Sequence, residues 1–124
     1  MIIKHKNIKL DDTELSQINR FYNLVIFLLL RNTDGQLKKN NFSCRVIQNI
    51  AGEYYDNRDY YVIVIKYNHK KVYTVDFQYL MGIDLNDVLT DSSRNLFTEL
   101  LSVLLMKNLY TNNIIKIKCE LIKK

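Results

Sequence analysis

Two long stretches of the chain carry apolar side chains at helical spacing. Asp11 and Glu14 form the acidic pair expected at a helix N-terminus, and apolar positions recur every three or four residues through residues 12–31. A polar Asp-Ser-Ser run marks the start of a second helix over residues 92–110. The pattern therefore predicts two long helices, with a short helical turn over residues 85–89 before the second.

The strongest strand signal lies in the middle of the chain. Residues 60–67 are almost all β-branched or aromatic, and residues 71–79 follow after Asn68 and His69, a pair suited to a tight turn. These two stretches are predicted to pair as a hairpin, with Asn68 and His69 at its tip.

Three further stretches resemble strands. Residues 42–50 (FSCRVIQNI) are predicted to form a strand. Residues 114–121 alternate apolar with charged side chains, which is typical of a strand with one face in water. Residues 2–8 are a candidate for an extra N-terminal strand. The order α-β-β-β-α-β predicts an α+β fold: a single domain over residues 1–124, with one mixed or antiparallel sheet and two long helices.

Both predicted helices are apolar around more than one side, over residues 24–30 and 100–106. A helix in a small two-layer domain buries one stripe. Either the helices pack on opposite faces of the sheet, or apolar surface is left for another molecule. We therefore expect self-association or a protein partner.

Composition excludes several classes of site. Cys44 and Cys119 lack partners at metal-ligand spacing, as do His5 and His69, and three glycines cannot build a phosphate-binding loop. We expect no metal, no cofactor and two inert, buried thiols. No apolar stretch is long enough for a signal peptide or a membrane span, so we expect a cytoplasmic protein without membrane contact.

One acidic arrangement has catalytic potential. If the hairpin has a two-residue turn and a regular register, Asp59 faces Gln78 and lies diagonal to Asp76. Two carboxylates placed in this way can hold Mg²⁺, which orients water for phosphodiester cleavage.

This layout resembles the PD-(D/E)xK nuclease superfamily, in topology and at Asp59, Asp76 and Gln78. Glu14 would match the acid that some members carry on the first helix. The chain departs from the family pattern at Arg58, where the family has proline, and at Gln78, where it has lysine. A divergent metal-dependent nuclease is therefore one alternative function.

A second alternative is a nucleic-acid-binding domain without catalysis. Lys66, Lys70 and Lys71 cluster at the predicted hairpin tip, and basic residues beside aromatic ones can follow a phosphate backbone and stack bases. The tyrosines nearby in sequence are also candidates for a protein interface, since tyrosine is enriched at binding hot spots. They are Tyr54, Tyr55, Tyr60 and Tyr61.

The preferred interpretation is a small non-enzymatic interaction protein. It follows from the short chain, the lack of a cofactor motif and the surplus apolar surface on the helices. The abundance of Lys, Asn, Ile and Tyr indicates an AT-rich genome. This makes a phage or mobile-element accessory protein that inhibits a host or defence factor our hypothesis.

Overall fold

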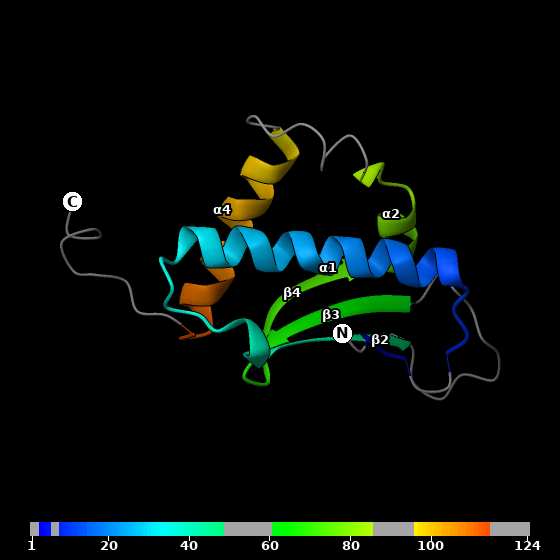
Figure 1. Ribbon diagram of the computed structural model, residues 1–124, viewed down its shortest axis with the longest axis horizontal. Coiled ribbons are helices and arrows are strands. Elements are labelled where there is room, and N and C mark those ends of the chain that lie inside the picture. The colour runs from blue at the N-terminus through cyan, green and yellow to red at the C-terminus, as the bar shows by residue number, and fades with distance from the viewer. Residues whose placement is uncertain (1–2, 6–7, 49–60, 86–95, 115–124) are drawn as a thin grey trace.

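The computed structural model describes residues 3–5, 8–48, 61–85 and 96–114 (Figure 1). These residues form an α+β fold, as predicted. The elements in chain order are strand β1 (Ile3–Lys4), helix α1 (Asp12–Asn32), the 3-10 helix η1 (Lys39–Asn41), strands β2 (Phe42–Gln48), β3 (Tyr61–Tyr67) and β4 (Lys70–Asp76), and helices α2 (Phe77–Met81) and α4 (Leu96–Thr111).

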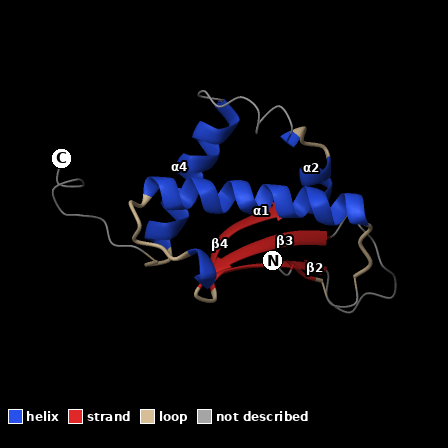
Figure 2. Cartoon of the chain, in the orientation of Figure 1, coloured by secondary structure: helices blue, strands red, loops and turns tan. Residues whose placement is uncertain are grey.

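The four described strands form one mixed sheet in the order β1-β2-β3-β4. Figure 2 labels the last three of them. β1 runs parallel to β2, and the other neighbouring pairs are antiparallel. The N-terminal strand is thus confirmed in a shorter form. Tyr61, Ile63 and Ile65 of β3 point from one face of the sheet into the core, together with buried residues of α1, α2 and α4. All three helices therefore share one core on the same face of the sheet rather than sandwiching it.

Helix α1 begins and ends close to the predicted bounds. The Oδ1 atom of Asp11 accepts a hydrogen bond from the backbone N–H of Glu14 at 2.8 Å, and the Oε1 atom of Glu14 accepts one from the N–H of Asp11 at 2.9 Å. This is the predicted capping box, and it satisfies two backbone donors that a helix start leaves open.

The predicted hairpin is also present. Asn68 and His69 both adopt positive φ angles, of 48° and 69°, which a two-residue turn between twisted strands requires. The register is regular only near the turn, where Lys66 pairs with Lys71, because Ile65 pairs with Tyr73 and leaves Val72 as an extra residue. This bulge was not predicted.

Helix α4 explains why the bulge is tolerated. The Asn108 side-chain amide donates a hydrogen bond to the carbonyl oxygen of Val72 at 2.7 Å, and that of Asn112 donates one to the carbonyl of Lys71 at 3.0 Å. β4 is the edge strand of the described part of the sheet, so these two amides bind carbonyl groups on its outer side.

The predicted end of β4 is wrong. The strand stops at Asp76, and residues 77–79, which were predicted to continue it, begin helix α2. Phe77 and Leu80 are buried and Tyr79 is exposed, which is the spacing of a helical turn and not of a strand. Of the predicted final strand over residues 114–121, the structure describes only Ile114, which is in a bend. The helix start over 92–95, Cys119 and most of the turn predicted over 85–89 also lie outside the described residues.

Cys44 is buried on β2, as predicted, and burial raises the pKa of its thiol to about 12. A thiol held in this way contains almost no thiolate at neutral pH, so it is chemically inert. In the described part of the chain, no helix combines the length and apolar character needed to cross a bilayer.

Candidate functional site

The residues of the nuclease hypothesis are only partly described. Asp59 lies outside the described residues. Asp76 is exposed at the end of β4, opposite Val62, and Gln78 is exposed on α2. Gln78 belongs to helix α2 and not to the strand that its predicted pairing with Asp59 assumed, and the described β3–β4 ladder ends at the Val62–Asp76 pair.

The helix acid of that hypothesis has a structural role. Glu14 completes the capping box of α1. Among the described residues, no three His, Cys, Asp or Glu side chains gather closely enough to hold a metal ion.

The tyrosine prediction needs one correction. Tyr61, expected at an interface, is fully buried, and its ring packs edge-on against Phe77 with centroids 5.6 Å apart. It is a core residue, because its position on β3 faces Phe77 of α2 and not the solvent. Tyr54, Tyr55 and Tyr60 lie outside the described residues.

The three hairpin lysines do come together. Lys66 and Lys71 are direct cross-strand partners, and Lys70 is the first residue after the turn. Lys70 and Lys71 are exposed and Lys66 is half-buried. Their role in binding stays a prediction.

Helix α4 carries three of the six large apolar side chains that are exposed on the described surface. Leu101, Leu105 and Leu109 recur every four residues and fill the core. The neighbouring positions stay outside: the side chains of Leu100, Val103 and Leu104 are 62%, 69% and 41% exposed, and we call these three residues the α4 face. Their i, i+3, i+4 spacing places them on one stripe of the helix.

A hollow lies on each side of the α4 face. One, of about 400 Å³, lies between Leu104, Phe21 of α1 and Tyr79 of α2. The other, of about 600 Å³, is bordered by Val103, Met106 and Tyr110. The α4 face therefore lies between two partly apolar hollows. The side chains of another helix could pack into these hollows.

Helix α1, unlike α4, buries most of its apolar side chains. Eight of its side chains are buried, so the surplus apolar character seen in its sequence is used inside the domain. Phe27 remains 56% exposed, but the Arg31 guanidinium lies 5.3 Å from its ring centre and covers part of it.

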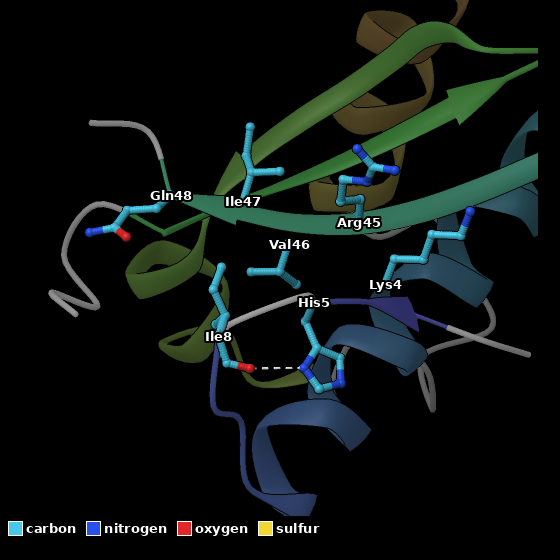
Figure 3. A pocket seen from close by; sticks show the side chains of 7 residues that line it. All are labelled: Lys4, His5, Ile8, Arg45, Val46, Ile47 and Gln48. Atoms are coloured by element: carbon cyan, nitrogen blue, oxygen red, sulfur yellow. Dashed lines mark hydrogen bonds between the residues drawn. The ribbon is translucent and has the colours of Figure 1, made fainter. Parts of the chain in front are cut away.

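A third hollow, of about 770 Å³, lies at the β1–β2 edge of the sheet (Figure 3). Lys4 and Arg45 border it on one side of the sheet, and Val46 points to the other. The Nδ1 atom of His5 lies 2.9 Å from the carbonyl oxygen of Ile8 and donates a hydrogen bond to it. The described residues around this hollow carry cations but neither a carboxylate nor a thiol, so they form no nucleophilic or metal-binding set.

Sequence reasoning identified residues 100–106 as too apolar for one buried stripe, but it could not say which of them stay exposed.

Comparison with family models, with curated proteins and with solved structures gives no match, so the nuclease resemblance rests on the sequence pattern alone.

Proposed function

We propose that the protein is a non-enzymatic interaction protein and that the α4 face is its binding surface, occupied by a second copy of the chain. The observation that carries this proposal is the exposure of Leu100, Val103 and Leu104 on one helix. Exposing three adjacent large apolar side chains has a free-energy cost in water, and covering them recovers roughly 25 cal/mol per Å² of apolar area.

The charges of α4 favour a second copy as the occupant. In an antiparallel pair of α4 helices related by a two-fold axis at Val103, each residue faces the one equally far on the other side of Val103. Glu99 of one copy then faces Lys107 of the other, and Leu100 faces Met106. Both charged residues are exposed in the single chain. Helix α4 is thus self-complementary in charge around the α4 face, as a two-fold interface requires.

Such an interface is small, because it consists mainly of one helix of 16 residues per copy. Interfaces below about 1,200 Å² are usually transient. We therefore expect self-association with a dissociation constant of micromolar order or weaker. The apparent mass of the protein should then rise as its concentration rises.

Replacing Val103 by Arg is expected to abolish this association. Two arginines would meet at the two-fold axis, so the variant should sediment as a monomer of 14.8 kDa at every concentration. Phe27→Arg makes the same change in charge at a side chain of similar exposure on α1, and it should associate as the wild type does. Sedimentation equilibrium across a concentration series measures all three proteins.

Two outcomes would reject the proposal. One is a wild-type chain that stays monomeric up to millimolar concentration. The other is a Val103→Arg variant that associates as strongly as the wild type, which would place the contact elsewhere on the surface.

A further inference from the structure

The sheet face opposite the helices is rich in positive charge. The strand register aligns its side chains in rows: Ser43, Lys66 and Lys71 lie across three strands, and Lys4 and Arg45 pair in the next row, beside Val64 and Thr74. We call Lys4, Arg45, Lys66 and Lys71 the basic face. Sequence reasoning had grouped Lys66 and Lys71 with the hairpin tip, but it could not place Lys4 and Arg45 beside them.

These cations are available to a ligand. Lys4, Arg45 and Lys71 are exposed and Lys66 is half-buried. Figure 3 shows Lys4 and Arg45 extending to the same side of the sheet, away from Val46 of the core. The described residues of these two rows include no carboxylate; Asp76 lies in the next row on the same face, opposite Val62 at the end of β4.

Without a bound anion, the positive charges of the basic face repel one another and destabilise the sheet. Lys66 and Lys71 are direct cross-strand partners, and like charges in this position destabilise a sheet. A bound anion would relieve that repulsion.

The neighbouring tip adds further positive charge. The backbone N–H of Asn68 donates to the carbonyl of Asn41 at 3.0 Å, and the N–H of Lys38 donates to the Tyr67 hydroxyl at 3.0 Å. These bonds hold η1 against the hairpin, as Figure 1 shows, and the η1 segment carries the exposed Lys38 and Lys39.

We propose that the basic face binds the phosphate backbone of a nucleic-acid duplex. Its cations lie in two adjacent rows across four strands, which suits a rod of closely spaced phosphates better than a single small anion. A duplex is favoured over a single strand because the described side chains of these rows carry no aromatic ring on which an unpaired base could stack. The site is separate from the α4 face and does not depend on the proposed self-association.

Binding of this kind is electrostatic and independent of sequence. Four phosphate contacts predict that the logarithm of the binding constant falls with the logarithm of salt concentration at a slope of roughly −3 to −4. At physiological salt we expect a dissociation constant on the order of 1 to 100 micromolar, the range of non-specific DNA binding, and tighter binding at low salt.

The test measures fluorescence anisotropy of a labelled DNA duplex of arbitrary sequence at two salt concentrations. The double variant Arg45→Glu and Lys71→Glu should bind at least tenfold more weakly, with a salt slope reduced by about two. The control variant, Lys9→Glu and Arg31→Glu, lowers the net charge of +5 by the same four units at exposed positions outside the basic face, and it should keep its affinity. Arg45→Gln and Lys71→Gln give a milder pair if the acidic variant melts at a lower temperature.

Several results would overturn the proposal. They are no binding of the duplex at low salt, equal loss of binding in the control variant, tighter binding of the matching single strand, or tighter binding of vesicles that contain anionic lipid. The last result would assign the basic face to a membrane surface instead.

Discussion

Replacing Leu80 by Ala is expected to lower the free energy of unfolding by about 2 to 5 kcal/mol, the usual effect of such a change in a core. Leu80 is fully buried on α2, and the carbonyl oxygen of that residue accepts a hydrogen bond from the Gln17 side chain of α1. Its neighbour Tyr79 is 61% exposed, so Tyr79→Ala should change stability by less than about 1 kcal/mol. Urea unfolding measures both.

This pair of variants distinguishes a helix from a strand after Asp76. A continued strand would bury residues 77 and 79 and expose 78 and 80, whereas a helical turn buries 77 and 80. A large loss of stability for Tyr79→Ala with little loss for Leu80→Ala would mean that β4 continues, as the sequence pattern had indicated. The nuclease hypothesis would then regain a strand position for Gln78.

Replacing Leu105 by Ala is expected to destabilise the fold by a similar amount, about 2 to 5 kcal/mol. Leu105 is fully buried between α4 and the rest of the core, while Leu104 next to it is 41% exposed. Leu104→Ala should therefore leave the unfolding of the monomer nearly unchanged but weaken self-association. The two measurements are thermal or urea unfolding at low protein concentration and sedimentation at high concentration.

The opposite ranking would contradict the orientation of α4. If Leu104→Ala destabilised the monomer more than Leu105→Ala, the helix would be rotated and the α4 face would lie in the core. A loss of association in Leu105→Ala without loss of stability would lead to the same conclusion.

Local signals in the sequence predicted much of the fold. The capping box of Asp11 and Glu14 and the turn at Asn68 and His69 depend on neighbouring residues, and both are confirmed. The end of β4 was missed because Phe77 and Tyr79 are both apolar and two residues apart, a spacing that also fits a strand. The helix forms there because Leu80 finds a place in the core, which only the tertiary structure provides.

The candidate sites depend on long-range contacts. The bulge at Val72 is supported by Asn108, which lies 36 residues away, so the shifted register could not be predicted from the hairpin itself. The rows of the basic face combine β1 with three later strands, and spacing along the chain carries no sign of this. The apolar surplus of residues 100–106 was visible in the sequence, but its division into buried and exposed leucines follows from how α4 packs. Inhibition of a host or defence factor stays a prediction from composition and chain length.

Cysteine cross-linking at position 103 is the most direct test of binding through the α4 face. In a chain with Val103→Cys and Cys119→Ser, the remaining Cys44 is buried and inert, so mild oxidation reports on position 103 alone. The two-fold arrangement brings residue 103 of both copies together and predicts rapid formation of a disulfide-linked dimer. It also predicts little cross-linking of Glu99→Cys with itself, because that residue faces Lys107 of the other copy. Absence of a cross-link at position 103, or equal cross-linking at 99 and 103, would contradict the proposed interface.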